Sequence, residues 1–366
     1  MKIAILTFFE SENYGTVLQA YALQRYLQTE GHQVELLHIK RMVNGQSSHY
    51  KVTQKTPTFL EKVQYKVVSI FQKKNVQGKT EKFKRFREEY LCVSKYYESD
   101  EALKEQLEDY DLFISGGDQI WNPYHKVFSL HYMFDFLPKE KPRISYGSSF
   151  GVAHIDDLSI LSKMKEQLDK YTAIGVREQS GVEIVKGLDI PASQVLDPVF
   201  LVKKEWAQFI EKRPLKKKYC LVYALIEYPE EEKRKLRAYA KKNGLKVVIL
   251  PYNRQNCLNG FKKGFGLSPQ EFLNYIAHAE HVFTNSFHGV AFSILLEKQF
   301  TLLGCASEEG MAKRERLIDV MKQFEIEDRQ IGAAGEIDYQ KVNEIVQNRI
   351  ADSEKYIKEA IKKAGE

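Results

Sequence analysis

A serine, a histidine and a glycine lie close together in the segment Ser286-Phe-His-Gly289. The residues before it, Val282 to Thr284, have the pattern of a short buried strand, and Val290 to Leu296 have that of a helix. A polar turn between a strand end and a helix start is where an open α/β sheet binds its ligands. Free N–H groups and the helix dipole favour an anion there. Because His288 lies in this turn, the segment predicts an anion site with a proton donor.

The helix expected before that strand carries a complete start signal. Ser268 is a natural N-cap, Pro269 fits the first helical position, and Glu271 completes a capping box. Phe272 and Ile276 then give the helix a buried face. The whole stretch from 268 to 296 is therefore predicted to run helix, strand, turn and helix.

The start of the chain predicts a βαβ unit. Ile3 to Thr7 and Val34 to Ile39 read as strands, and Gly31 closes the helix between them. One face of that helix is formed by residues at helical spacing, namely Thr16, Ala20, Leu23 and Leu27. The unit predicts a parallel sheet with a right-handed crossover. Its first loop has no GxGxxG, so a dinucleotide site is unsupported.

Three further strands of this half end in polar or small residues. Asp111 to Ser115 leads into Gly116-Gly117-Asp118, Ile144 to Gly151 ends in small residues, and Ala173 to Val176 leads into Arg177-Glu178. Val195 to Pro198 reads as a short strand with a stop. Because the carboxyl ends of parallel strands share one edge, these residues are predicted to form half of a site there.

A second α/β domain is predicted after the charged, proline-containing stretch from Lys203 to Lys218. Its expected strands are Tyr219 to Leu225, Lys246 to Leu250, Val282 to Thr284 and Phe300 to Leu303, and helices are expected at Arg314 to Phe324 and Asp338 to Ala364. The predicted division is an N-terminal Rossmann-like domain at 1–203, a C-terminal one at 204–345 and a C-terminal helix at 346–366.

The composition is that of a soluble globular protein, with 366 residues, 43% apolar and 28% charged. The four cysteines lie far apart without a CxxC pair, which argues against a zinc site or a disulfide framework and suits a reducing compartment. The N-terminus reads as a strand and not as a signal peptide. No uninterrupted apolar run reaches 18 residues. A cytoplasmic protein is expected.

A basic helical insert is predicted at about 58–90. Between Glu61 and Tyr90 nine Lys or Arg stand against four Glu. Such a cluster either is a solvated helix face or contacts nucleic acid, anionic lipid or an anionic substrate. A non-catalytic module that binds nucleic acid or another anionic polymer is one hypothesis, but the chain has no nucleic-acid motif, so no nucleic-acid partner is predicted.

Four segments together resemble the polysaccharide pyruvyltransferases: NYGTVLQAYAL at 13–23, DLFISGGDQIWNP at 111–123, VREQSG at 176–181 and the whole of 268–300. The resemblance implies a GT-B-like fold, α/β with two Rossmann-like domains facing across a cleft. It also implies transfer of a pyruvyl group from phosphoenolpyruvate to two hydroxyls of a sugar in a cell-surface polysaccharide precursor, forming a ketal.

That reaction needs a general acid, a base for the hydroxyls and a clamp for an anion of about three charges, but no metal or other cofactor. The predicted catalytic residues are His288 as acid and Asp118 as base. The predicted donor contacts are Asn285, Ser286, Gly289, Arg177, Arg314 and Arg316, and the predicted acceptor contacts are Asn13, Gly15 and Gly117.

Each of these assignments has a structural alternative. His288 is otherwise a core histidine, Asn285 and Ser286 cap a helix, and Arg177 pairs with Glu178 or another acid. Arg314 and Arg316 are otherwise a solvated pair. The glycines, Asn13 and Asp118 otherwise only shape tight turns.

The alternative enzyme is a GT-B glycosyltransferase that uses a nucleotide sugar. Asp109-Tyr110-Asp111 spells a DxD, but it precedes its strand and is predicted to be a helix-to-strand turn. The expected partners are phosphoenolpyruvate and a sugar or lipid-linked oligosaccharide acceptor, with peripheral contact at a membrane surface through the basic insert. The sequence does not indicate the acceptor sugar or the oligomeric state.

Overall fold

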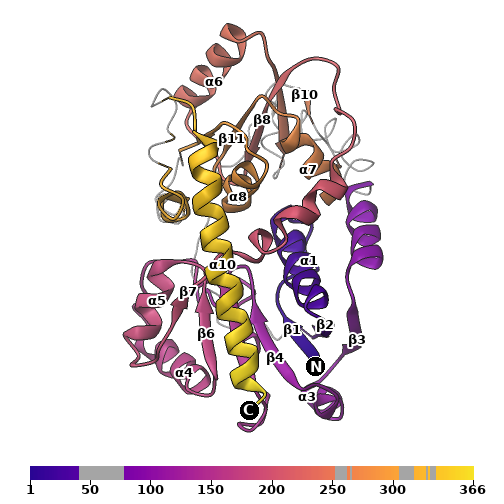
Figure 1. The fold of residues 1–366 in the computed structure, drawn as a ribbon, viewed down its shortest axis with the longest axis vertical. Coiled ribbons are helices and arrows are strands. Elements are labelled where there is room, and N and C mark those ends of the chain that lie inside the picture. The colour runs from indigo at the N-terminus through magenta and orange to yellow at the C-terminus, as the bar shows by residue number, and fades with distance from the viewer. Residues whose placement is uncertain (41–77, 252–261, 264–265, 305–316, 327–328, 330–334) are drawn as a thin grey trace, which may run out of the picture.

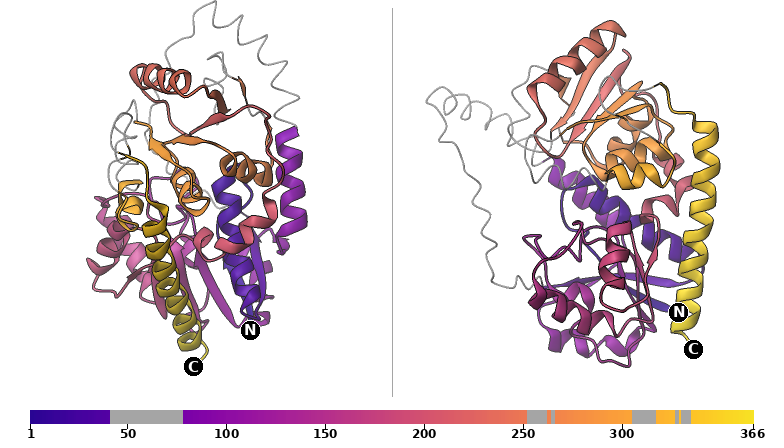
Figure 2. Two further views of the ribbon diagram at one scale, coloured as in Figure 1. Left: turned by 45° about the horizontal axis from the view of Figure 1, so that its top comes forward. Right: turned by 90° about the vertical axis from the view of Figure 1, so that its left-hand side faces the viewer.

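Two parallel β-sheets, one above the other, make up the computed structural model (Figure 1). It describes residues 1–40, 78–251, 262–263, 266–304, 317–326, 329 and 335–366. Each sheet has helices on both faces (Figure 1, Figure 2). The fold is therefore two α/β units, as the sequence predicts.

The first sheet has seven strands in the order β3-β2-β1-β4-β5-β6-β7, all parallel. They are β1 (Lys2–Leu6), β2 (Gln33–Ile39), β3 (Val93–Tyr97), β4 (Leu112–Gly116), β5 (Arg143–Ser148), β6 (Ala173–Val176) and β7 (Ser193–Gln194). The strand order reverses between β1 and β4. In sheets of this kind the carboxyl edge at such a switch point binds ligands.

The second sheet has five parallel strands in the order β10-β9-β8-β11-β12. They are β8 (Tyr219–Ala224), β9 (Lys246–Pro251), β10 (Lys262–Lys263), β11 (His281–Thr284) and β12 (Phe300–Leu302). Here the order reverses between β8 and β11. The segment 285–289 follows β11 and so lies at this second switch point.

Alternate residues of the strands face two separate cores. Ile3 and Ile5 of β1 pack in the same cluster as α1 (Tyr14–Thr29) and α10 (Tyr339–Ala364). Ala4 and Leu6 pack on the other face. The elements on that second face are α3 (Asp100–Lys104), η1 (Leu107–Asp109), η2 (Leu130–Met133), α4 (Leu158–Leu168) and α5 (Gln179–Lys186). The period of two makes each strand contribute to both cores.

The second sheet is covered by α7 (Pro269–Ala277) and α8 (Phe287–Leu295) on one face and by α6 (Glu230–Lys242) on the other. The capping box on Ser268 is present in full, with Glu271 as its partner, so this part of the sequence prediction is confirmed. The face with α7 and α8 belongs to the same apolar cluster as α1. One core thus continues from one sheet to the other.

The last helix, α10, runs beside both sheets (Figure 1, Figure 2). Near its start the hydroxyl of Tyr339 donates to the carbonyl of Ser293 in α8, and further along Tyr356 donates to Ser145 in β5. The helix is continuous from Tyr339 to Ala364 and so passes through position 346 without a break. Among the described residues, no helix has both the length and the apolar character needed to cross a membrane.

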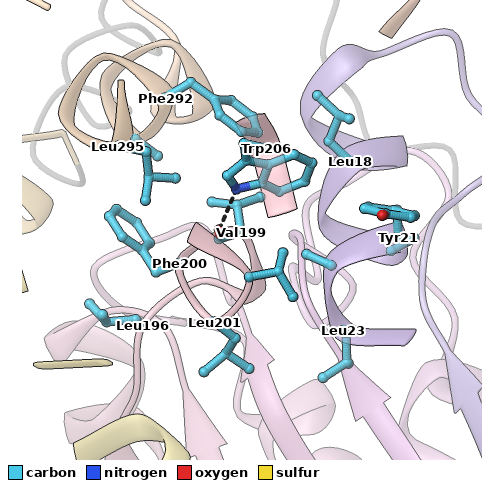
Figure 3. Packing of buried hydrophobic residues seen from close by; sticks show 14 of the residues in the cluster. Leu18, Tyr21, Leu23, Leu196, Val199, Phe200, Leu201, Trp206, Phe292 and Leu295 are labelled. Carbon is cyan, nitrogen blue, oxygen red and sulfur yellow. Dashed lines mark hydrogen bonds between the residues drawn. The ribbon is translucent and has the colours of Figure 1, made fainter. Parts of the chain in front are cut away.

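A short segment between the sheets, with η3 (Pro198–Phe200) and η4 (Lys203–Phe209), packs between α1 and α8 (Figure 3). Trp206 is 1% exposed, lies 5.2 Å from Phe292 and 5.7 Å from Tyr21 between ring centroids, and donates from Nε1 to the carbonyl of Val199. We call Leu18, Tyr21, Val199, Trp206 and Phe292 the apolar seam. It joins the two halves through buried side chains.

Two predicted boundaries are wrong. Val195 to Pro198 is not a strand: β7 is only Ser193–Gln194, and Pro198 opens η3. The last bond to β6 is donated by the N–H of Val195 to the carbonyl of Val176, after which Asp197 caps η3. The helix expected from Val290 begins at Phe287, because Ser286 caps it. His288 therefore lies in the first helical turn.

Only part of the predicted basic insert is described. Residues 78–90 are helical, and residues 58–77 lie outside the described residues. Phe83 and Phe86 are buried in the core, with ring centroids 5.2 Å from Tyr14 and 6.0 Å from Tyr21. Lys84 and Arg85 are exposed. The described part thus packs its apolar stripe on α1 and leaves these basic side chains in solvent.

Candidate active site

His288 lies where the two halves meet. Ser286 accepts a hydrogen bond from the N–H of Gly289 at 3.3 Å, which starts α8 and puts His288 in its first turn. The residue is 7% exposed. Its Nε2 lies 3.5 Å from Oδ2 of Asp197 and has no hydrogen-bond partner among the described residues. A buried imidazole nitrogen without a partner is unusual and calls for an explanation.

Asp197 is shared between His288 and Arg177. Nη1 of Arg177 donates to Asp197 Oδ2 at 2.9 Å, and the N–H of Val199 donates to Oδ1 at 3.1 Å. Burial alone would raise the pKa of Asp197. The charges of His288 and Arg177, together with the hydrogen bond from Arg177, outweigh burial and lower it from 3.8 to about 2. Asp197 is therefore a carboxylate at neutral pH.

Arg177 is buried and contacts both carboxylates and an aromatic ring. Its Nη2 donates to Ser149 at 3.0 Å, and its guanidinium carbon lies 3.9 Å from the ring centroid of Phe287, next to His288. Burial by itself would lower the pKa of Arg177, but the carboxylates of Asp197, Glu178 and Asp118 raise it above its ordinary value. The structural alternative for Arg177, a pair with an acid at the domain junction, is thus present.

Glu178 fixes the loop after β5. Its Oε1 accepts from the Ser149 hydroxyl and from the N–H groups of Phe150 and Gly151 at 2.7–3.0 Å. Its Oε2 is buried, lies 3.7 Å from Nε of Arg177 and has no hydrogen-bond partner among the described residues. We call Arg177, Glu178, Asp197 and His288 the polar junction. It draws on β6, on the segment before η3 and on α8.

Gly15 lies directly against His288. A β-carbon built on Gly15 would be 2.0 Å from Nδ1 and 2.3 Å from Cγ of the imidazole, so no other residue fits without moving the ring. Asn13 caps α1 by accepting from the N–H of Gly15 at 3.0 Å. The first turns of α1 and α8 therefore meet here. Two helix dipoles with their positive ends together favour an anion at this point.

Asp118 lies at the first switch point, between β1 and β4. Its Oδ2 accepts from the hydroxyl of Thr16 at 2.5 Å, and its Oδ1 from the N–H of Gln119 at 2.8 Å. Asp118 and Gly117 both have positive φ, 52° and 69°. A β-carbon on Gly117 would be 1.6 Å from Oε1 of Gln19. The turn thus needs a glycine to bring β4 against α1, whatever else it contacts.

The remaining predicted donor residues around the start of α8 also have structural roles. Asn285 accepts from the N–H groups of Leu225 and Ile226 at 2.8 and 3.3 Å, and so joins the ends of β8 and β11. A β-carbon on Gly289 would be 2.1 Å from Oγ1 of Thr284. Arg314 and Arg316 lie outside the described residues.

The Asp109-Tyr110-Asp111 motif lies away from this site, as predicted. Asp109 ends η1, and Oδ2 of Asp111 accepts from the N–H of Lys2 at the amino end of β1. The motif is a helix-to-strand turn at the opposite edge of the sheet. It does not face His288.

The structure thus brings together predicted residues from both halves, but it adds one that the sequence prediction lacks. Asp118, Gly117, Asn13 and Gly15 follow β1 and β4, Arg177 follows β6, and His288 follows β11. Asp197 is the addition. A charged residue between Leu196 and Pro198, inside an otherwise apolar run, was the available signal.

The arrangement can hold a proton and an anion side by side. Asp197 and Glu178 carry two carboxylates and Arg177 one positive charge, so a protonated His288 brings the formal charge of the polar junction to zero. A histidine that can hold a proton at a helix start is suited to general acid chemistry on an anionic substrate.

Two facing Rossmann-like sheets with a site between their carboxyl edges define the GT-B fold. The chain is similar to the UDP-GlcNAc 2-epimerase from Neisseria meningitidis bound to UDP-GlcNAc, at 12% identity over 99% of this chain and 100% of that one, with a TM-score of 0.50. The corresponding epimerase from Methanocaldococcus jannaschii is 11% identical over 95% and 92%, with a TM-score of 0.49. At 12% identity the likeness to the Neisseria enzyme shows the fold alone.

The sequence then identifies the family within this fold. The model of the polysaccharide pyruvyl transferase family matches residues 13–307. The chain therefore belongs to the polysaccharide pyruvyl transferase family, and the resemblance stated above is confirmed. Among curated proteins no sequence matches the chain.

Proposed function

We propose that this protein transfers a pyruvyl group from phosphoenolpyruvate to two hydroxyls of a sugar in a polysaccharide precursor. The observation that carries the proposal is His288, a buried histidine in the first turn of α8 that faces Asp197 and Gly15 of the other half. Family membership supports the pyruvyl group and the saccharide acceptor. The proposal adds the donor, the product and the roles of the residues.

The reaction balances without a redox partner. The methylene carbon of phosphoenolpyruvate gains one proton, C2 forms bonds to two sugar oxygens, and the C2–O bond to phosphate breaks. The two hydroxyls lose two protons, of which one replaces the proton that the acid gave to carbon and the other leaves with the phosphate. The step that a protein must assist most is protonation at carbon, because C2 becomes electrophilic only then.

In this proposal His288 gives the proton to the methylene carbon. The donor phosphate and carboxylate lie near the joined starts of α1 and α8, where two helix dipoles stabilise negative charge. Asp118, at the switch point beside α1, is the proposed base for an acceptor hydroxyl. Its side chain is partly exposed and its Thr16 contact comes from the same helix start as Gly15.

Arg177 is proposed to act on the donor without contacting it. Its guanidinium already donates to Asp197 and Ser149 and stacks on Phe287. We therefore propose that it acts on the donor through the field of its charge and through Asp197. Arg314 and Arg316 remain proposed donor contacts.

The test is release of phosphate from phosphoenolpyruvate in the presence of a panel of p-nitrophenyl hexosides and N-acetylhexosaminides. We expect one or more acceptors to raise phosphate release by the wild type, and His288→Ala to reduce it ~10²–10⁴-fold. Labelling with [3-¹³C]phosphoenolpyruvate must give a methyl signal of a ketal in the product. Equal rates for His288→Ala and the wild type would remove His288 from its role.

A ligand screen separates this proposal from a nucleotide-sugar glycosyltransferase. Thermal unfolding is measured with phosphoenolpyruvate and with UDP, each in millimolar excess. Stabilisation by phosphoenolpyruvate alone is expected, since a ligand raises the unfolding temperature only when it binds the native state. Stabilisation by UDP alone overturns the proposal.

The proposed setting is the cytoplasm, with an acceptor on a lipid carrier. This part of the proposal rests on the separated cysteines and on the basic residues before Tyr90.

A further inference from the structure

We propose that Asp197 is a positioning residue that holds the His288 imidazole by Nε2, so that Nδ1 is the atom that gives the proton to the substrate. The inference rests on the proposed function, because it assigns the atoms of that reaction. It also makes a separate statement about the imidazole, namely which nitrogen keeps its proton. That statement can be tested without turnover.

The two nitrogens of His288 lie in different surroundings. Nε2 is buried, and among the described residues its polar neighbour is Oδ2 of Asp197, at 3.5 Å. Nδ1 is on the side of Gly15, which lies so close that a β-carbon there would be 2.0 Å from this nitrogen. Only a glycine leaves the ring in this position, and Nδ1 is the nitrogen that Asp197 does not face. Catalytic contacts of this length commonly shorten when a substrate binds.

Asp197 is itself held from two other directions. Arg177 donates to the same oxygen that faces His288, at 2.9 Å, and Val199 N–H holds the second oxygen at 3.1 Å. Such a carboxylate cannot rotate away from the imidazole without breaking both contacts. A carboxylate so fixed orients a histidine and stabilises its charged form, as in other acid–histidine pairs.

Most of the charged groups around Asp197 and His288 are negative. Arg177 and Glu178 follow β6, Asp118 follows β4, and α1 contributes the uncharged Gly15. These groups, with Asp197, sum to two negative charges, since three carboxylates face one guanidinium. When the imidazolium gives the Nδ1 proton to the methylene carbon, it becomes neutral, Nε2 keeps its proton and Asp197 stays ionised.

The first experiment compares Asp197→Asn with a matched variant, Glu178→Gln. Both remove a buried carboxylate beside Arg177, but Asp197 also faces His288. We expect Asp197→Asn to lower kcat ~10²-fold or more and to change the KM for phosphoenolpyruvate little. On the alkaline side of the profile, where the general acid loses its proton, kcat is expected to decline at a lower pH than in the wild type. Glu178→Gln removes a carboxylate that contacts Arg177 and not His288, so it is expected to lower the unfolding temperature and to shift the pH profile less than Asp197→Asn does.

Equal pH profiles of kcat for Asp197→Asn and the wild type overturn the inference. The same holds if Glu178→Gln moves the profile as far as Asp197→Asn does, because the effect then comes from charge loss beside Arg177. A wild type that releases no phosphate from phosphoenolpyruvate contradicts the proposed function and leaves the statement on the imidazole to the second experiment.

The second experiment needs no variant of Asp197 to fold. Long-range ¹H–¹⁵N correlation spectra of the ¹⁵N-histidine-labelled wild type report which nitrogen of each neutral imidazole carries the proton. The His288 signal is assigned by its absence in His288→Gln. We expect the Nε2–H tautomer above the titration midpoint. An Nδ1–H tautomer overturns the inference whatever the substrate is.

Discussion

The apolar seam and the polar junction join the same two halves in opposite ways. The seam uses α1, η3, η4 and α8, whereas the junction uses the residues after β6, the residue before η3, and α8. In the seam Trp206, Tyr21 and Phe292 bury rings against one another. In the junction Asp197 and Arg177 bury opposite charges, and Nε2 of His288 and Oε2 of Glu178 lack hydrogen-bond partners among the described residues.

The difference indicates which region stabilises the fold and which serves chemistry. Burial of large apolar side chains gives a dependable gain in free energy. Buried ion pairs are often no more stable than apolar residues of the same volume. The seam therefore accounts for how the halves stay in place, and the distance from His288 to Asp197 depends on it. The buried charges of the polar junction give no comparable gain in stability, and this favours a functional role for them.

The largest expected effect on stability belongs to Trp206→Ala. The indole is buried in the seam, so its removal leaves a cavity between the halves and is expected to lower the free energy of unfolding by about 3–5 kcal/mol. Urea unfolding followed by circular dichroism measures it. Trp206→Phe keeps a ring but loses the bond to Val199, and is expected to cost clearly less. Equal losses for both variants would contradict the role given to the ring.

Gly15→Ala is the second change, and it breaks the junction from the side of α1. The new methyl group meets the His288 ring, so the ring or α8 must move, at a cost of about 1–3 kcal/mol for overpacking. Phosphate release is expected to fall even where the variant stays folded, because the His288 ring moves away from Asp197. Gly78→Ala is the control, since a β-carbon there meets nothing within 4 Å. Full phosphate release by Gly15→Ala would show that the ring position does not matter.

Acid unfolding tests the charge of Asp197. The folded-state pKa is about 2 and the ordinary value is 3.8, with burial outweighed by His288 and Arg177. Because the folded-state pKa is the lower one, this stabilisation is fully present above about pH 4 and is lost as pH falls through about 2. It amounts to about 2 kcal/mol. The difference in free energy of unfolding between wild type and Asp197→Asn, followed from pH 5 to pH 2, should shrink by that amount. A constant difference would contradict it.

Much of the fold could be predicted from local patterns. The run from Ile3 to Ile39 reads as strand, helix and strand because two short strand-like segments flank a segment with apolar residues at helical spacing, and the structure confirms this. β3 was missed because this edge strand, Val93–Tyr97, buries only Tyr97 fully and so lacks an apolar pattern. β10 has only two residues, both lysines. Edge strands depend on pairing with a neighbour, which a single sequence does not reveal.

Part of the candidate site could also be predicted from the sequence, and part could not. The strand ends of β4, β5 and β6 could be placed on one rim because parallel neighbours end together, and the order β4-β5-β6 confirms it. The pair of Asp197 and His288 could not be predicted. The two residues are 91 positions apart and belong to different halves, and their contact depends on how the seam docks those halves. Arg177 likewise gave no sign that its partner would be Asp197 and not only the adjacent Glu178.

The smallest expected effects come from two helix caps, and they sharpen the comparison. Ser268 caps α7 in a full capping box, and Ser286 caps α8. Either serine replaced by alanine should lower the free energy of unfolding by about 1 kcal/mol, because one helix-start N–H loses its partner. Only Ser286→Ala should also lower phosphate release, since the first turn of α8 carries His288, whereas α7 carries Phe272 stacked on Tyr14 at 4.5 Å. Parallel urea titrations and rate measurements on the two variants test this. If both variants lost activity equally, the junction would respond to any loosening between the halves, and its separation from the seam would be wrong.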